Sequence, residues 1–478
     1  MGTYLNRTPS SAGNEKTWTV SLWVKRASIT STSAQFLFAS DTNYSDYVYC
    51  RFMGTENTGK EDELQVVLAE PNGRTANVTT NRKFRDPSSW YHIVVRCDTT
   101  QSTSTDRLRV YVNGSQETSL RDNSQLNQND DNMNWNSNVP QVIGAQLSSG
   151  TSERFQNGYI TNFVNIDGQS LAPTSFGETD STTGEWKPKA DLSGLTFGTN
   201  GFWLKYESAG NLGLDSSGNS NTYTVNNAGT NAKTVDTASN NFCTLNPIAP
   251  GTNLSQTTFS EGNLKVVSAG TTSSSGDQIV SSLGFTKGKW YWEIKGVSNP
   301  DNMFWMVFND VLGGKRPYHD NYAYAMYGDG NGNNSQIYES QESAQKGYGI
   351  DSNTCFSDND IIQFAFDCDN YRLYVGRNGQ WTNYNAASGG TITNGSTFNQ
   401  NNPTGYYQIS TAAAQTGVYR AALIKAGSSV QYTAQINFGN PPFTIASGNA
   451  DANGLGNFEY AVPSGYYALC TKNINQYG

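Results

Sequence analysis

The sequence predicts an all-β protein with two antiparallel β-sandwich (jelly-roll) domains in tandem. Three observations lead to this fold class: a composition that suits strands and turns, a strict alternation of apolar and polar residues in short segments, and a change of sequence character near mid-chain. With 478 residues, the chain is too long for one typical hydrophobic core, so more than one domain is expected.

The composition favours short strands joined by tight turns. Charged residues make up 15% of the chain, against roughly 25% in average proteins. Aromatic residues account for 12%, and there are 47 Gly. Aromatic and β-branched residues favour strands, while Gly and Asn favour turns. Few segments combine apolar residues at helical spacing with good helix formers, so we expect few helices.

The first half of the chain contains a series of segments with strand periodicity. The clearest is TWTVSLWVKR (17–26), whose alternation marks a half-buried strand. RLRVYVNG (107–114) ends in Asn-Gly, a hairpin signal. About seven or eight such strands indicate a sandwich rather than one open sheet. The other predicted strands are 35–40, 64–70, 90–98, 141–146 and 158–167.

The sequence changes character between residues 236 and 260, where Pro and Gly cluster and mark the main domain boundary. Before it, the Asn/Asp/Gln-rich residues 121–140 are expected to form a long loop. FWLKY (202–206) and TYTV (222–225) return to strand character, as an extension of the first domain or a small β connector. The expected domains are 1–235 and 236–478.

The second half restarts the strand rhythm. In KWYWEIKG (289–296), Trp290, Trp292 and Ile294 are expected on the core face because they alternate with polar or amphipathic residues. MFWMVF (303–308) is a continuous apolar run, as expected for a central strand. The remaining predicted strands are 361–369, 371–379 and 429–439.

Charge, cysteine usage and hydropathy exclude several classes of protein. The formal net charge of -9 argues against binding to nucleic acid or anionic membranes, both of which need a basic face. The six cysteines are scattered without a CxxC pair, so we expect buried, reduced thiols and no zinc site. No run approaches 18 apolar residues, so no membrane insertion is expected. The N-terminus lacks an apolar signal region, which indicates synthesis in a cytoplasm.

Both halves resemble known families. TWTVSLWVKR, WYHIVVRCD, RLRVYVNGSQ, QVIGAQ and FQNGYITNFVNIDG occur in the order of the laminin-G-like, or concanavalin-A-like, jelly-roll family, over roughly 1–170. Many members carry acidic residues in the last of these strands, where this chain has Thr161 and Asn162. GKWYWEIKG, IIQFAFDCDNYRLYVGRNGQW and INFGNPPF resemble the SPRY family over roughly 260–445. That resemblance implies a protein-binding platform that uses loops at one edge of the sandwich.

Two longer strings resemble virion proteins of tailed bacteriophages, particularly marine ones. They are YLNRTPSSAGNEKTWTVSLWVKR (4–26) and NNFCTLNP (240–247). This resemblance implies a virion location after synthesis in the host cytoplasm, with other virion proteins as partners and a homo-oligomer in the particle. The chain enters a predicted strand by residue 17 and has no heptads or fibrous repeat. A compact tail appendage or capsid decoration protein is therefore expected rather than a shafted fibre.

The carboxylate groups do not form an obvious catalytic pattern. A glycosidase needs two carboxylates on either side of the scissile bond. Glu61, Asp62 and Glu63 are consecutive and follow a Gly-rich turn, so we expect a solvated loop. Glu293 lies in a predicted strand, where a cross-strand ion pair is expected. We therefore expect no catalytic residues and no enzymatic activity.

Metal and nucleophile chemistry are also not expected. Calcium is the one cofactor left open, because it favours several oxygen ligands and the second half has an acidic cluster. However, its four members lie two at each end of one predicted strand, about 20–30 Å apart if extended, so turn formation is expected. His92 and His319 have no nearby nucleophile pattern, and a structural role is expected for both. The acidic cluster comprises Asp358, Asp360, Asp367 and Asp369.

An aromatic patch is the sequence's best candidate for a binding surface. Aromatic faces stack on sugars and anchor protein interfaces, although ordinary strand packing is the alternative. The patch comprises Tyr318, Tyr322, Tyr324 and Tyr327. Our leading hypothesis is a phage virion structural protein that mediates assembly and surface recognition. The alternatives are a carbohydrate-binding receptor adhesin that recognises a host-surface glycan, and a capsule-degrading glycan enzyme.

Overall fold

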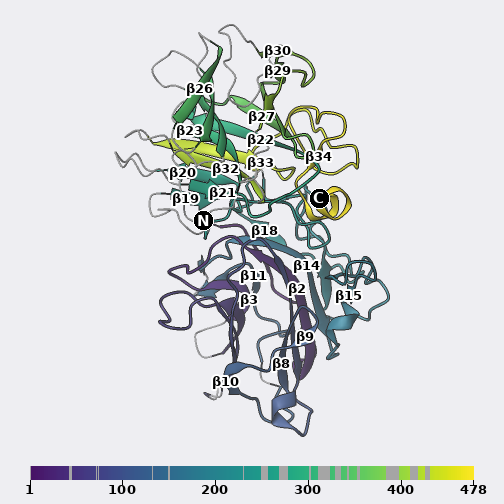
Figure 1. Ribbon diagram of the computed structural model, residues 1–478. Helices are drawn as coiled ribbons and strands as arrows, with labels where there is room; N and C mark the ends of the chain where they lie inside the picture. Colours follow the sequence, from purple (N-terminus) through teal and green to yellow (C-terminus); the bar gives the residue numbers. More distant parts are fainter. Residues whose placement is uncertain are drawn as a thin grey trace. The chain divides into compact units, whose positions relative to one another are not determined.

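The computed structural model confirms the all-β fold class, with antiparallel sheets throughout both halves (Figure 1). In the described residues, the sole α-helix is α1 (Thr471–Tyr477), drawn in yellow at the C-terminus. None of the helices in the described part of the chain is long and apolar enough to cross a membrane. The structure describes residues 2–41, 46–70, 73, 75–131, 133–148, 151–229, 231–248, 257–268, 278–300, 303–309, 323–328, 335–341, 344–351, 356–383, 398–409, 418–425 and 431–478.

The chain divides into two compact units. Unit 1 consists of Met1–Lys233 with Thr237–Ser239, and unit 2 consists of Thr234–Asp236 with Asn240–Gly478. In Figure 1, unit 1 runs from purple to teal and unit 2 from teal through green to yellow. Within the connecting segment, residues 234–236 therefore group with unit 2 and residues 237–239 with unit 1.

Unit 1 is built from two antiparallel sheets. The eight-stranded sheet has the order β10-β6-β5-β4-β3-β11-β1-β18, and the six-stranded sheet has the order β17-β14-β2-β7-β8-β9. The first sheet contains β1 (Tyr4–Arg7), β3 (Gln35–Asp41), β4 (Tyr47–Phe52), β5 (Glu63–Ala69), β6 (Thr75–Lys83), β10 (Leu120–Ser124), β11 (Gln141–Ile143) and β18 (Thr224–Asn226). The second contains β2 (Thr17–Arg26), β7 (Trp90–Asp98), β8 (Leu108–Val112), β9 (Ser115–Gln116), β14 (Gly158–Asp167) and β17 (Phe202–Leu204).

The core of unit 1 follows from the period of two in its strands. In β2, Trp18, Val20, Leu22 and Val24 all lie in the main hydrophobic core, as their alternation predicts. The opposite face of β2 is buried as well, although a half-buried strand was expected. A second apolar cluster, which includes Trp203, covers this sheet from outside, because the segment after β14 folds back over it. That segment includes the hairpin of β15 (Gly177–Thr179) and β16 (Trp186–Pro188).

Residues 121–140 form a loop from residue 125 onward, as their polar composition predicts, but part of this loop is buried. The segment begins within the edge strand β10, which pairs with β6. It also inserts Met133 and Trp135 into the core, where Trp135 donates a hydrogen bond from Nε1 to Asn165 Oδ1 at 3.0 Å. Two apolar residues in a polar segment are enough to fix it, because burial of a Trp outweighs the neighbouring polarity.

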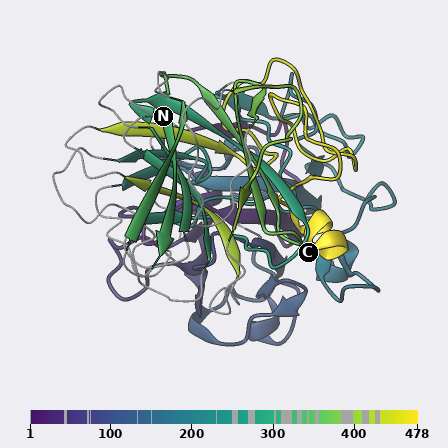
Figure 2. The ribbon, with the colours of Figure 1, turned by 45° about the horizontal axis from the view of Figure 1, so that its top comes forward.

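Unit 2 also contains two sheets, seen from two directions in Figures 1 and 2. The ten-stranded sheet has the path β19-β20-β33-β22-β27-β28-β29-β30, with β31 paired to β28 and β34 paired to β22. The second sheet has the order β21-β32-β23-β24-β25-β26. All pairs are antiparallel except that of β22 with β34.

The short hairpin of β12 (Gln146–Ser148) and β13 (Thr151–Glu153) belongs to unit 1.

Each segment of unit 2 that was predicted from alternation contains or overlaps an observed strand. The first sheet contains β19 (Thr257–Ser260), β20 (Lys265–Ser268), β22 (Lys289–Ser298), β27 (Ile361–Asp367), β28 (Arg372–Arg377), β29 (Gln380–Thr382), β30 (Phe398–Gln400), β31 (Tyr407–Gln408), β33 (Tyr432–Asn437) and β34 (Tyr467–Ala468). The second contains β21 (Gln278–Val280), β23 (Met303–Asn309), β24 (Ala323–Gly328), β25 (Ser335–Gln341), β26 (Ala344–Asp351) and β32 (Tyr419–Lys425).

Strand β22 confirms the predicted core face of unit 2. Trp290, Trp292 and Ile294 lie in its main hydrophobic core. The opposite face of β22 is covered by the C-terminal segment, so Tyr291 joins a second apolar cluster with Phe458. The cysteines also agree with the prediction: the five in the described part of the chain are free and buried, and Cys355 lies outside it.

Candidate functional site

The predicted tyrosine patch falls largely outside the described residues. Tyr318 and Tyr322 lie beyond them. Tyr324 and Tyr327 belong to strand β24, whose backbone pairs with β23 on one side and β25 on the other. The patch therefore stays a prediction, and the site with a defined geometry is in unit 1.

That site is a pocket on the outer face of the eight-stranded sheet, formed by β3, β4 and the β12 hairpin. Its volume is about 210 Å³, and we call it the outer-face pocket. Its lining combines aromatic rings with polar side chains, a mixture that suits an amphipathic ligand. The lining residues are Phe36, Ala39, Ser40, Tyr47, Tyr49, Arg51 and Gln146.

The alternation of β4 positions one wall of the outer-face pocket. Val48, Cys50 and Phe52 are buried in the core of unit 1. Tyr47, Tyr49 and Arg51 therefore face the other way, where they are partly buried. This strand was not among those predicted, because its outward positions carry tyrosine, which blurs the contrast between apolar and polar residues.

A bulge in β3 supplies the opposite wall. The register with β4 shifts between Phe36 and Phe38, which adds one residue to β3. As a result, Leu37 and Phe38 both lie in the core, while Phe36 and Ala39 join a separate outer cluster with Tyr49. Without the extra residue, strict alternation would put Phe36 and Phe38 on one face.

The aromatic rings of the outer-face pocket are held against one another. The rings of Tyr47 and Tyr49 stack with centroids 5.4 Å apart and an interplanar angle of 6°. Phe36 meets Tyr49 edge to face, with centroids 5.2 Å apart. The guanidinium carbon of Arg51 lies 4.7 Å from the Tyr49 centroid and 5.4 Å from the Phe36 centroid. Arg51 therefore gains from cation–π contacts on two rings.

Two polar groups at the pocket have unused hydrogen-bonding capacity. Arg51 donates from Nε to Gln65 Oε1 at 2.9 Å, and no described residue accepts a hydrogen bond from its two Nη groups. The buried Oε1 atom of Gln146 has no hydrogen-bond partner among the described residues. The pocket thus combines an aromatic platform with a cationic donor.

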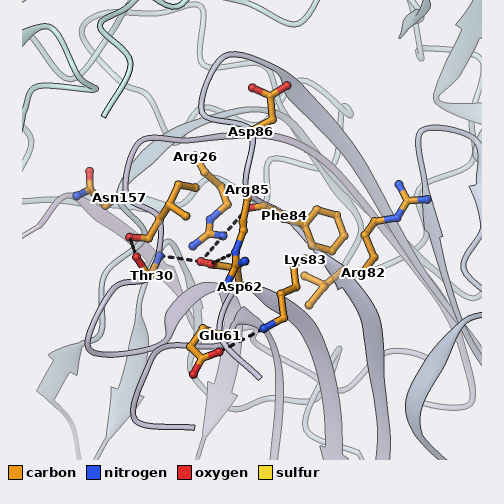
Figure 3. A network of polar contacts seen from close by, with 12 residues as sticks. Arg26, Thr30, Glu61, Asp62, Arg82, Lys83, Phe84, Arg85, Asp86 and Asn157 are labelled. Atoms are coloured by element: carbon orange, nitrogen blue, oxygen red, sulfur yellow. Dashed lines mark hydrogen bonds and ion pairs between the residues drawn. The ribbon is translucent and has the colours of Figure 1, made fainter. Parts of the chain in front are cut away.

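A buried ion-pair network lies at the end of the same sheet (Figure 3). Asp62 Oδ1 accepts hydrogen bonds from Arg26 Nη1 at 3.0 Å and from the backbone N–H of Thr30 at 2.9 Å. Asp62 Oδ2 accepts from Arg85 Nε at 2.9 Å. Figure 3 shows Asp62 between the two arginines. The solvated loop expected for 61–63 is wrong, because the side chains of Asp62 and Glu63 are fully buried.

Asp62 also explains how the turn before β5 is made. Its φ of 64° lies in the left-handed region, which Asp and Asn tolerate better than most residues. Arg26 ends β2 and donates a second hydrogen bond to the Phe84 carbonyl, and its guanidinium lies 4.5 Å from the Phe52 centroid. Burial lowers the pKa of Arg26, and Asp62 opposes that shift. Arginine nevertheless stays charged in proteins, so its anion is essential.

His92 has the contacts of a structural residue, as expected. Its ring stacks on Trp23 with centroids 4.6 Å apart. Trp186 donates from its indole Nε1 to His92 Nδ1 at 3.0 Å, so the proton of the neutral ring must sit on Nε2. That Nε2–H donates to Ser21 Oγ at 2.8 Å. Burial lowers the pKa of His92 to about 3, so a neutral His92 in this tautomer cannot take a proton from Ser21. His319 lies outside the described residues.

Glu293 in unit 2 does not form the expected cross-strand ion pair. No cation contacts it in the described part of unit 2. Its carboxylate is fully buried and instead accepts four hydrogen bonds. The donors are Tyr291 OH (2.9 Å), Asn437 Nδ2 (3.2 Å) and the backbone N–H groups of Glu459 (3.0 Å) and Tyr460 (2.8 Å). Burial raises the pKa of Glu293 to about 7 despite these donors.

The acidic cluster considered for calcium is engaged in local contacts at the two ends of β27. Among the described residues, no group of three or more His, Cys, Asp or Glu side chains could hold a metal ion. The contacts are those of Asp358 with the N–H of Asn299, Asp360 with Arg377, Asp367 with Lys289, and Asp369 with the N–H of Gly288.

Comparison with known proteins supports the fold of unit 1. Residues 2–164 match the family model of the concanavalin A-like lectin/glucanases superfamily. This match confirms the resemblance expected for the first half of the chain. No curated protein matches the sequence.

Several solved structures are similar to part of the chain, and these similarities concern the fold alone. The SPRY domain of human HERC1 is 12% identical, covering 36% of this chain and 87% of its own, with a TM-score of 0.24. The PSpry domain of TRIM65 is 11% identical, covering 41% and 91%, with a TM-score of 0.27. A candidate carbohydrate-binding protein from Bacteroides ovatus is 14% identical, covering 49% and 60%, with a TM-score of 0.31.

The buried network predicts that Asp62→Asn strongly lowers the stability of unit 1. The variant keeps a residue that tolerates the left-handed backbone but leaves Arg26 buried without its anion, which costs about 3–5 kcal/mol. Urea unfolding followed by tryptophan fluorescence measures the loss in unit 1. Adding Arg26→Met should recover part of it, because no buried charge then lacks a partner. Glu61→Gln, which removes the charge of a neighbouring, partly exposed carboxylate that pairs with Lys83, is the matched control. Equal stability of Asp62→Asn and Glu61→Gln would contradict the account.

Glu293 predicts a pH dependence of unit 2. The pKa of Glu293 is about 7 in the folded protein, against the ordinary value of 4.5. Between these values the folded state holds a proton that the unfolded state releases, so stability falls as the pH rises from 4.5 to 7. The wild type should lose on the order of 3 kcal/mol relative to Glu293→Gln across this window. Urea midpoints at several pH values measure it, with the exposed Glu261→Gln as control. The same dependence of the urea midpoint on pH in wild type and Glu293→Gln would refute the raised pKa of Glu293.

Proposed function

We propose that the chain is a carbohydrate-recognising structural protein whose unit 1 holds a sugar ring in the outer-face pocket. The observation that carries this proposal is the stacked pair Tyr47 and Tyr49 beside Arg51 and Gln146. Sugar rings present apolar C–H faces to aromatic rings, and their hydroxyl groups need donors and acceptors placed at the rim. The match of residues 2–164 to a superfamily that includes lectins supports the same proposal.

The size of the outer-face pocket favours one sugar unit of a longer glycan. Pockets for whole drug-sized ligands are about 300–1,000 Å³, and this one is about 210 Å³. The remaining sugars of the glycan would then lie in solvent. A shallow site of this kind suits weak single contacts that are repeated in an oligomer, since linked copies raise the overall affinity.

Binding without catalysis is part of the proposal. The described residues that line the outer-face pocket include neither Asp nor Glu. Hydrolysis of a glycosidic bond needs an acid and a second carboxylate on either side of it. The pocket therefore holds a sugar but has no lining group to protonate its leaving oxygen.

The wider role that we propose is a component of a phage virion. The support is the pair of sequence strings 4–26 and 240–247, which resemble phage virion proteins. In that setting unit 1 recognises a host-surface glycan, and unit 2 contacts other virion proteins. The expected form is a tail appendage or capsid decoration protein.

The sugar site predicts that Tyr47→Ala weakens glycan binding about tenfold, because stacking on one aromatic ring is worth roughly 0.5–1.5 kcal/mol. A glycan array identifies a ligand, and isothermal titration calorimetry with that ligand measures the change. Tyr477→Ala is the matched control, since it removes a partly exposed stacked tyrosine from unit 2. A ligand that binds wild type and Tyr47→Ala equally well would place the glycan elsewhere.

The virion role predicts that purified particles of the encoding phage contain this chain. Mass spectrometry of particles separated on a density gradient should detect its peptides in constant ratio to the major capsid protein. Particles free of these peptides would contradict the virion role and leave the sugar site untouched.

A further inference from the structure

We propose that the outer-face pocket selects an acidic sugar, such as a uronic acid, and that Arg51 binds its carboxylate. This inference rests on the proposed sugar site and names the class of sugar that it takes. It starts from a guanidinium that lines the pocket and lacks a carboxylate partner among the described residues.

The charge of Arg51 is the first argument. Among the described residues that line the outer-face pocket, none is acidic. Arg154 is a second cation near Tyr49, and it is paired with Glu56 through an Nη1–Oε1 distance of 2.7 Å. Arg51 has no ion pair within the described part of unit 1, so its charge is available to a ligand. A partly buried cation beside apolar rings favours an anion more strongly than a cation in bulk water does.

The second argument is that the Arg51 side chain is already held in place. Its Nε–H is used by Gln65, whose own amide nitrogen donates to Asn77 Oδ1 at 3.3 Å. Its flat face lies over Tyr49 and Phe36. The Nη groups are the donors that remain, and a guanidinium fork matches a carboxylate with two parallel hydrogen bonds. Little side-chain entropy is lost on binding, because the side chain is pre-ordered.

The third argument is that the other lining groups suit the rest of a uronic acid. The ring of Tyr47 supplies an aromatic face for the C–H side of the sugar. Gln146 also lines the pocket and adds a polar side chain beside this aromatic face. A sulfate ester would also match the charge and the fork of Arg51, so the test includes a sulfated probe.

The test compares matched acidic and neutral sugars on the full-length chain. The probes are tetrasaccharides of galacturonic acid, of mannuronic acid and of hyaluronan, each beside its carboxyl-reduced counterpart, with dextran sulfate as the sulfated arm. Titration calorimetry at low salt should show at least one acidic probe bound about tenfold or more tighter than its reduced form. Raising the salt concentration should narrow this gap, because salt screens the exposed part of the ion pair.

Variants of Arg51 assign the selectivity to one side chain. Arg51→Gln should lower the affinity for the acidic probe to that of the reduced probe, and Arg51→Lys should be intermediate, since it keeps the charge and loses the fork. Lys233→Gln, which removes an exposed positive charge elsewhere, is the control and should change nothing. Thermal unfolding by circular dichroism checks that each variant is folded.

Each other outcome is decisive. Equal affinity for acidic and reduced probes, with both lost in Tyr47→Ala, would overturn acid selectivity and keep the sugar site. Acid selectivity that survives Arg51→Gln would overturn the role of Arg51. Tighter binding of dextran sulfate than of every uronate would overturn the carboxylate in favour of a sulfate ester. Binding of none of the probes or array glycans would overturn both proposals.

Discussion

The period of two in β4 ties the core of unit 1 to its candidate binding surface. The same six residues place Val48, Cys50 and Phe52 in the core and Tyr47, Tyr49 and Arg51 in the outer-face pocket. Burial of the inner set therefore fixes the register of the outer set, because a slip of one residue would exchange the two faces. The pocket thus takes its rigidity from the core beneath it, without needing a rigid loop.

A buried ion pair fixes the position of the strand next to β4. Arg26 ends β2 in one sheet, and Asp62 precedes β5 in the other, so their ion pair joins the two sheets of unit 1 at one end. β5 is also the neighbour of β4 and supplies Gln65, which holds Arg51. Such a pair adds little net stability over an apolar pair, but it specifies one arrangement, since either charge alone would be strongly unfavourable.

Sequence reasoning recovered the elements whose signal is local. The strict alternation in 17–26 and 289–296 gave both strands and their core faces. Alternation did not reveal β4, because tyrosine occupies its outward positions. The predictions of a solvated loop for Asp62 and of an ion pair for Glu293 were wrong. Asp62 meets Arg26 across 36 residues and Glu293 meets Tyr460 across 167 residues. Partners at such separations are fixed by sheet topology, which no local pattern encodes. The outer-face pocket was missed for the same reason, since it joins β3, β4 and β12.

We propose that unit 1 recognises an acidic sugar on the outer face of a sheet rather than at a loop edge. A crystal structure of the full chain with a bound uronic acid tetrasaccharide tests it most directly. We expect one sugar ring against Tyr47, with its carboxylate within hydrogen-bond distance of the Arg51 Nη groups. A tetrasaccharide bound to the loops at either end of the sandwich, with the outer-face pocket holding only solvent, would contradict it.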